Sequence, residues 1–144
     1  MYGWCGRILW VNLSEGTVFD KALDPKVAKE YIGGRGLGIH ILRNYAKPHV
    51  DALSPDNPLI MATGPLTGTG ALTGARYMVT TKSPLTGAIT SSNSGGIFPT
   101  ELKRAGYDAI VIIGRSDKPV YLWLEKDNAE LRSAAHLWGK NTHK

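Results

Sequence analysis

The sequence predicts an α+β fold in which most strands form antiparallel hairpins and the helices are few and short. Short apolar or β-branched runs alternate with turn sequences along the chain, and only a few segments have helical signals. Clustered hairpins with occasional helices are typical of this class. Because 144 residues are enough for one domain with its own core, residues 1–144 are treated as a single domain.

The first predicted element is a β-hairpin. Residues 7–13 alternate and are rich in strand-forming side chains, and the turn sequence at 12–16 separates them from a second strand at 17–19. Asp24 followed by Pro25 is typical of a helix N-cap and first helical position. The sequence therefore predicts a short helix directly after the hairpin.

Glycines then interrupt the helical pattern. Those at 33, 34 and 36 are expected to end the first helix, and residues 37–45 can form a second one. Residues 59–63 are predicted to form a short buried strand.

The tetrapeptide PLTG occurs twice, at 65–68 and 84–87. Proline sets φ at the start of a turn and glycine accepts the positive φ that closes it. The second copy lies between the predicted strands 77–82 and 87–91, which favours a four-residue hairpin loop. Two matching turns indicate repeated hairpin geometry and not a repeat architecture.

The C-terminal third is predicted to hold a helix and further strands. Residues 99–105 form a short amphipathic pattern that Gly106 ends, and 108–113 is the strongest strand signal of the chain. The alternating segment 119–125 is expected to pair with it. A turn at Asp127 and Asn128, a last strand at 129–132 and a tail without clear pattern at 136–144 complete the chain.

Composition excludes several classes of function. The net charge is +5, but the cations are dispersed, so a nucleic-acid surface is disfavoured, although a weak electrostatic binder stays an alternative. Cys5 is the only cysteine, which excludes an internal disulfide and any cysteine-ligated cluster built by this chain alone. The N-terminus lacks a signal-peptide pattern and no apolar run approaches membrane-spanning length. We expect a cytoplasmic protein without membrane contact.

The segment from Gly64 to Gly96 indicates an anion-binding surface. It holds seven glycines, many hydroxyls and the cations Arg76 and Lys82, and residues 57–100 contain no acid. Glycine lets backbone N–H groups approach a ligand, and the absence of carboxylates removes repulsion toward phosphate. The sequence therefore predicts a phosphate-bearing ligand here.

Nucleotide motifs do not explain this segment. A P-loop needs lysine where Ala75 stands, and the spacing Gly68-x-Gly70-x3-Gly74 is one residue too long for a dinucleotide fingerprint. Asn93-Ser-Gly-Gly96 is a better binding candidate, because it can offer backbone groups to phosphate or a hard cation, but a plain turn is an equal alternative. Arg76 can bind phosphate through both of its terminal nitrogens, or it is a solvated residue at a strand end.

Catalytic residues are not found. The histidines at 40, 49, 136 and 143 lack metal-ligand spacing, and no serine lies in a nucleophile elbow.

Taken together, blocks along the whole chain resemble the N-terminal domain of aldehyde:ferredoxin oxidoreductases. The blocks are MYG (1–3), RILWVNL (7–13), GGRGLG (33–38), LSPDN (53–57), TGPLTG (63–68), RY (76–77), TKSPLTG (81–87), NSGG (93–96), ELK (101–103), AGYDAIV (105–111) and LWGK (137–140). Family members are tungsten, sometimes molybdenum, enzymes that oxidise aldehydes to carboxylic acids and pass electrons to ferredoxin. Their metal is held by two molybdopterin dithiolenes beside a 4Fe–4S cluster.

The resemblance implies roles for three residues. Arg76 would contact the phosphate side of one pterin, Asn93 and Gly95 would line the same pterin, and the Asn93 carbonyl would lie near a magnesium ion that bridges the two phosphates. The N-terminal domain forms a β-rich base under this cofactor in the family. The resemblance thus favours the binding interpretation of Asn93 and Gly95 over a plain turn.

The chain is much shorter than full family members. The family places its cluster cysteines, second set of pterin contacts and proton-transfer residues in later domains, so no catalytic residue is assigned and turnover by this chain alone is not expected. An expressed N-terminal piece, a split subunit and a truncated product are the open alternatives, with self-association of the exposed faces expected. A binding module for a phosphorylated or pterin ligand, without redox activity, is the alternative function.

Overall fold

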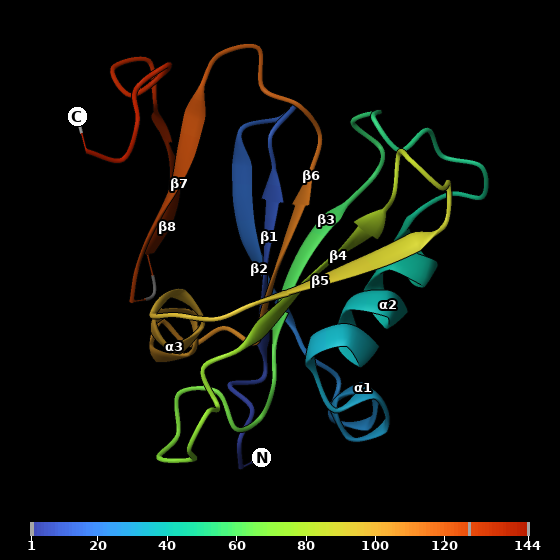
Figure 1. Ribbon diagram of the computed structural model, residues 1–144, viewed down its shortest axis with the longest axis vertical. Helices are drawn as coiled ribbons and strands as arrows, with labels where there is room; N and C mark the ends of the chain where they lie inside the picture. Colours follow the sequence, from blue (N-terminus) through green and yellow to red (C-terminus); the bar gives the residue numbers. More distant parts are fainter. Residues whose placement is uncertain (1, 127, 144) are drawn as a thin grey trace.

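The computed structural model describes residues 2–126 and 128–143 as a six-stranded sheet beside a two-stranded one (Figure 1). The strands are β1 Arg7–Asn12, β2 Thr17–Ala22, β3 Leu59–Thr63, β4 Tyr77–Lys82, β5 Ile89–Ser94, β6 Ala109–Ile113, β7 Val120–Glu125 and β8 Asn128–Ser133. The large sheet has the order β2-β1-β6-β3-β4-β5, and β7 pairs with β8. Within the described residues, β1 and β6 are parallel and the other strand pairs are antiparallel, so the predicted fold class is confirmed.

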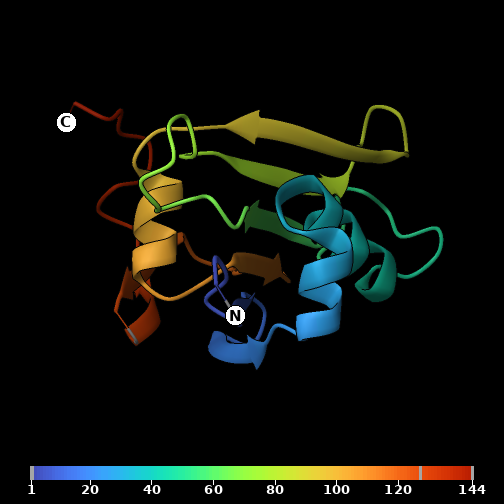
Figure 2. The ribbon, with the colours of Figure 1, turned by 90° about the horizontal axis from the view of Figure 1, so that it is seen from below.

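Three short helices lie on the two faces of the large sheet. They are α1 Pro25–Tyr31, α2 Gly34–Tyr45 and α3 Phe98–Arg104. Figure 2 shows α1 and α2 on one side of the sheet and α3 with the β7–β8 pair on the other. The predicted cap of α1 is confirmed, because the Asp24 carboxylate accepts the N–H of Lys26 at 2.8 Å.

The core consists of two apolar clusters separated by the sheet. Along β1, Ile8 and Trp10 face α1 and α2, while Leu9 and Val11 face α3 and the β7–β8 pair. Strands β1 and β6 lie inside the sheet, so both of their faces are buried, which explains the continuous apolar run of β6.

Helix α2 lies close to the sheet because glycine faces it. A Cβ built on Gly38 would lie 2.5 Å from Oγ1 and 3.0 Å from Cβ of Thr80, which is a fully buried residue of β4. Two helix positions away, a Cβ on Gly36 would lie 2.5 Å from the carbonyl oxygen of Tyr31. These glycines therefore permit close packing of α2 against β4 and against the end of α1.

We expect Gly38→Ala to destabilise the protein by about 1–3 kcal/mol, although alanine favours helix, because the new methyl overlaps Thr80. Urea unfolding of the 144-residue chain measures the difference. Gly70→Ala is the control, since its Cβ meets nothing within 4 Å and its effect is expected to stay within about 0.5 kcal/mol. Equal stability of the two variants would contradict this packing.

One predicted boundary and one predicted pairing are corrected. Helix α2 begins at Gly34, so the glycines at 34 and 36 belong to its first turn and do not separate the helices by a long break. Strand β7 pairs with β8 and not with β6, because both edges of β6 are already occupied by β1 and β3. The predicted turn at Asp127 lies partly outside the described residues.

Strand β5 is shifted relative to the prediction of 87–91. The hairpin loop extends over 83–88, where Ser83 N–H donates to the carbonyl of Ala88 at 2.8 Å and Gly87 N–H to that of Ser83 at 2.9 Å. Consequently β5 runs from Ile89 to Ser94 and includes Asn93. The interpretation of Asn93 as part of a plain turn is therefore wrong: it is a strand residue that opposes Met78.

Candidate functional site

The structure brings Arg76, Asn93 and Gly95 together at one end of the β4–β5 hairpin. Arg76 directly precedes β4, and Asn93 lies near the end of β5. The guanidinium Nη1 of Arg76 donates to Oδ1 of Asn93 at 2.7 Å, while Nδ2 of Asn93 lies 3.0 Å from the sulfur of Met78. Both side chains are exposed, so they can meet a ligand without a rearrangement of the core.

Gly95 lies against the backbone that precedes β4. A Cβ at this position would lie 3.2 Å from the carbonyl oxygen of Ala75 and 3.3 Å from Cδ of Arg76. A larger residue would therefore push the arginine side chain away from its present place. By contrast, a Cβ on Gly64 or Gly70 would meet nothing within 4 Å, so these glycines face open space.

The segment 64–76 forms the loop that connects β3 and β4. Turns at its start and end are held by backbone hydrogen bonds from Thr67 to Gly64 at 3.2 Å and from Gly74 to Ala71 at 3.3 Å. The buried hydroxyl of Thr67 also accepts the N–H of Gly64 at 3.3 Å and donates to the carbonyl of Arg76 at 3.1 Å. The start and the end of the loop are thus joined through one side chain.

A pocket of about 390 Å³ lies between this loop and the start of α2. Its wall includes two β-branched residues with positive φ, Ile32 at 62° and Thr73 at 60°. Side chains of this type rarely adopt such a backbone, and strained residues cluster where a ligand is bound. The remaining lining residues are Gly33, Gly34, Gly64, Pro65, Leu66, Thr67, Gly74, Arg76, Tyr77 and Met78.

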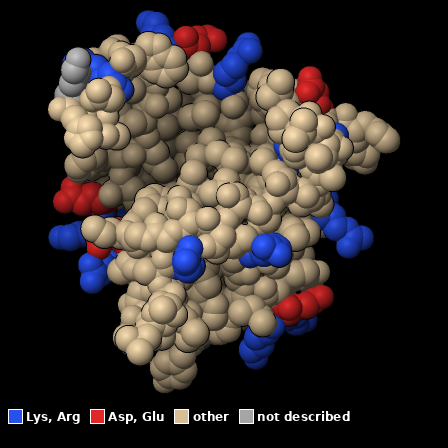
Figure 3. Space-filling view, in the orientation of Figure 1, with Lys and Arg blue, Asp and Glu red and all other residues tan. Residues whose placement is uncertain are grey.

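The electrostatic character of the site is cationic. No acid occurs between Asp56 and Glu101, the first turn of α2 has no acidic residue, and Glu101 pairs with Arg104 on α3. Figure 3 shows basic side chains near the centre of this face and both acidic and basic ones along its margins. An arginine, exposed glycine backbone and missing carboxylates fit an anionic ligand such as a phosphate group.

Comparison with known proteins places the chain in a family. A family model described as aldehyde ferredoxin oxidoreductase, N-terminal domain, matches residues 8–144. The chain belongs to this family. It is 54% identical over 140 residues to the tungsten-containing aldehyde ferredoxin oxidoreductase of Pyrococcus abyssi and 55% identical over 140 residues to that of Pyrococcus furiosus. These matches cover 97% of this chain and 23% of each relative, so the chain spans about a quarter of their length.

Two further relatives have other names. The aliphatic sulfonate oxidoreductase, WOR-like subunit, of Pyrococcus furiosus is 38% identical over 144 residues, which cover 96% of this chain and 22% of that protein. A solved structure, the active site complex BamBC of benzoyl coenzyme A reductase in complex with 1,5-dienoyl-CoA, superposes with a TM-score of 0.94 at 42% identity. It covers 96% of this chain, and this chain covers 21% of it.

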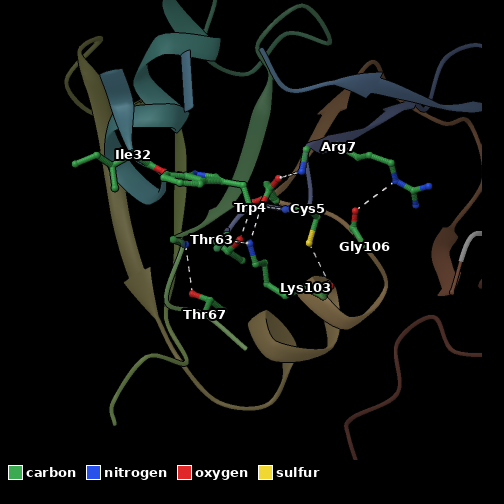
Figure 4. Close-up of polar contacts among 12 residues, drawn as sticks. Trp4, Cys5, Arg7, Ile32, Thr63, Thr67, Lys103 and Gly106 are labelled. Carbon is green, nitrogen blue, oxygen red and sulfur yellow. Dashed lines mark hydrogen bonds and ion pairs between the residues drawn. The ribbon is translucent and has the colours of Figure 1, made fainter. Parts of the chain in front are cut away.

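In this aldehyde ferredoxin oxidoreductase N-terminal domain, a buried carboxylate anchors the start of the chain (Figure 4). Asp108, which is 1% exposed, accepts the backbone N–H groups of Cys5 at 3.0 Å and Gly6 at 2.7 Å. The Nζ of Lys103 donates to the same carboxylate at 2.6 Å and to the carbonyl of Gly3 at 2.8 Å. The carbonyl of Asp108 in turn accepts both the N–H and the hydroxyl of Thr63, directly before the glycine-rich loop.

Cys5 lies beside the hydrogen bonds of Asp108 and Lys103. Its Sγ lies 3.4 Å from the carbonyl oxygen of Lys103, to which the thiol donates. Partial burial raises the pKa of the Cys5 thiol, and Asp108 raises it further, while Lys103 opposes the shift. Cys5 is therefore held as a protonated thiol, the form that can donate this hydrogen bond.

Sequence reasoning did not identify Asp108 and Thr67 as site-supporting residues. Asp108 belongs to the predicted strand 108–113 and to a family block, but neither indicates an anchoring role, because Cys5 and Gly6 are about 100 positions away in the chain. Thr67 lies in the repeated PLTG, whose sequence predicts a turn and forms part of the family block 63–68 but indicates no supporting role for the threonine. Within residues 2–126 and 128–143, no group of three or more His, Cys, Asp or Glu side chains can hold a metal ion, and no helix is long and apolar enough to cross a membrane.

Proposed function

We propose that this chain is the cofactor-base domain of a tungsten–pterin aldehyde:ferredoxin oxidoreductase, an enzyme that oxidises aldehydes to carboxylic acids with ferredoxin as acceptor. Identity supports this choice, because the two tungsten-containing aldehyde enzymes are 54% and 55% identical, against 38% for the sulfonate enzyme and 42% for the benzoyl-CoA reductase. The domain contributes one side of the cofactor site, and the later domains contribute the other.

The observation that carries the proposal is the contact of Arg76 with Asn93 beside Gly95. Arg76 would hold a phosphate group of the pterin, Asn93 and Gly95 would line the pterin, and the Asn93 carbonyl would be a ligand for Mg²⁺. The surroundings of these three residues fit such a group, because a side chain at position 95 would crowd Ala75 and Arg76 and because no acid occurs between Asp56 and Glu101 to repel phosphate. When bound, the tungsten–pterin group supplies the redox chemistry of aldehyde oxidation, with molybdenum as the alternative metal.

The relatives also explain why no catalytic residue is assigned here. Their names refer to aldehydes, aliphatic sulfonates and a coenzyme A thioester, yet this domain occurs in all of them. A domain shared by enzymes with different substrates is best suited to a task other than substrate choice, and we assign it the binding of the cofactor. Substrate selection and proton transfer then belong to residues outside this domain.

Later domains are the principal partners in this proposal. Three apolar side chains near the cradle are strongly exposed, Leu66 at 61%, Leu72 at 93% and Ile97 at 78%, which is typical of a surface that another domain covers. A 4Fe–4S cluster needs cysteines from those domains, because Cys5 is the only one here. We also propose that the complete enzyme passes its electrons to ferredoxin, forms a homo-oligomer and is located in the cytoplasm.

The complete enzyme, purified without oxygen, is expected to contain tungsten, magnesium and pterin and to reduce ferredoxin when an aldehyde is added. Metal analysis and fluorescence of the released pterin measure the cofactor, and parallel assays with an aliphatic sulfonate and a dienoyl-CoA compare substrates. Cofactor without aldehyde oxidation would refute the substrate assignment alone. Absence of metal and pterin would favour the phosphate-binding module.

A further inference from the structure

We propose that Thr67 is the positioning residue for Arg76, which rests on the proposed role of Arg76 in holding phosphate. Thr67 is 3% exposed, so it borders the pocket beside Arg76 but offers little surface of its own to a ligand. It acts through the backbone, because its hydroxyl donates to the carbonyl of Arg76 at 3.1 Å and accepts from the N–H of Gly64 at 3.3 Å.

These two hydrogen bonds hold the backbone of Arg76. The N–H of Arg76 donates to the carbonyl of Gly74 at 2.9 Å, a residue of the same exposed loop, so this bond alone does not tie Arg76 to the rest of the fold. Thr67 provides a second tie, because Gly64 directly follows β3, a strand that is paired on both edges with β4 and β6. Figure 4 shows Thr67 and Thr63 side by side at this junction. Thr67 thus joins the backbone of Arg76 to the end of β3, in addition to the pairing of the adjoining strand β4 with β3 and β5 and the contact of the guanidinium with Asn93.

The two copies of PLTG differ in this respect. In the second copy the equivalent residue is Thr86, which is exposed and whose hydroxyl accepts the N–H of Ala88 at 3.3 Å, within its own turn. In the first copy the turn is folded against the sheet, so the same residue type bridges the loop ends. The role of Thr67 therefore comes from its tertiary setting and not from the motif.

The geometry also explains why threonine is suited to this position. Valine has the same shape without the hydroxyl, and serine keeps the hydroxyl without the methyl group. Thr67→Val is therefore expected to leave the carbonyl of Arg76 without its buried donor and to loosen the guanidinium. Thr63→Val is a matched control, because Thr63 is equally buried at 2% and also donates to a backbone carbonyl, but not to that of Arg76.

The test uses the ¹⁵N-labelled 144-residue chain and two measurements. The heteronuclear NOE of the Arg76 Nε–H, identified by its loss in Arg76→Lys, reports guanidinium order without a ligand. Titration with inorganic pyrophosphate reports anion affinity. Thr67→Val is expected to lower the NOE and to raise the Kd about fivefold, while Thr67→Ser and Thr63→Val stay close to the parent chain. Thr67→Ala gives the same comparison if valine is not accommodated.

The outcomes separate this inference from the proposed function. An unchanged NOE in Thr67→Val would overturn the positioning role, because the Arg76 guanidinium would then not be loosened. An equal loss of NOE in Thr63→Val would also overturn it, because the loosening would then follow from the loss of any buried hydroxyl near the loop. A parent chain that does not bind pyrophosphate, together with an enzyme that retains its cofactor without Arg76, would overturn the phosphate role of Arg76. In that case the ligand-free NOE comparison still decides whether Thr67 positions Arg76.

Discussion

Arg76→Ala in the complete enzyme is expected to lower the tungsten and pterin content about 10- to 100-fold while the fold stays intact. Hydrogen bonds to charged groups are worth about 1.5–3 kcal/mol, and every 1.4 kcal/mol is about tenfold in binding. Arg76 is exposed and outside the apolar core, so its loss has little effect on stability. Metal analysis of the purified variant, with its circular dichroism spectrum, measures both expectations.

Two variants act as controls for Arg76. Arg115→Ala removes an exposed cation that follows β6 at the opposite end of the sheet, and it is expected to leave tungsten content unchanged. Arg76→Lys keeps the charge but not the planar fork, so an intermediate cofactor content is expected. If Arg76→Ala and Arg115→Ala retained equal amounts of tungsten, Arg76 would have no special role in the site.

Asp108→Asn is expected to destabilise the 144-residue chain by about 3–5 kcal/mol, the largest stability effect that we predict. The ion pair with Lys103 is buried, with side-chain exposures of 8% for lysine and 2% for aspartate. Removal of the negative charge leaves a buried ammonium group without its partner and weakens the bonds from Cys5 and Gly6. Urea unfolding, with the slope compared between variants, measures the change.

The surface pair of Glu101 and Arg104 is the natural control. Their side chains are 52% and 69% exposed, so Glu101→Gln is expected to cost less than about 1 kcal/mol. The double variant Asp108→Leu with Lys103→Met should recover only part of the loss, because the N–H groups of Cys5 and Gly6 stay unpaired. A cost for Asp108→Asn no larger than that for Glu101→Gln would contradict the anchoring role of Asp108.

Local patterns predicted most of the secondary structure of this chain. Strands 59–63 and 77–82 were predicted with the observed bounds, and Asp24 caps α1 through the expected hydrogen bond. These features depend on neighbours a few positions away, so side-chain periodicity and capping preferences carry the information. Prediction of β5 failed because the actual length of the hairpin loop decided its register, and a four-residue loop was assumed.

The sequence predicted the residues of the site that would contact a ligand, but not the residues that hold them in place. Glycine content, the acid-free segment and the family resemblance pointed to Arg76, Asn93 and Gly95, and the structure brings all three together. The supporting role of Thr67 was not predicted, because the same tetrapeptide occurs at 84–87. Its threonine there is exposed, so the tetrapeptide does not indicate burial or a supporting role. Nothing in the local sequence distinguishes the two copies.

Residue type and order alone predict the element types, the acid-free glycine-rich surface and the family of this domain. Tertiary structure alone decided that β6 lies between β1 and β3, that β7 pairs with β8, and that Asp108 and Thr67 connect the chain start to the arginine of the site. The physical reason is distance along the chain. Pairing partners about 100 residues apart are selected by burial and by unsatisfied hydrogen-bonding groups in the assembled fold, which no local pattern records.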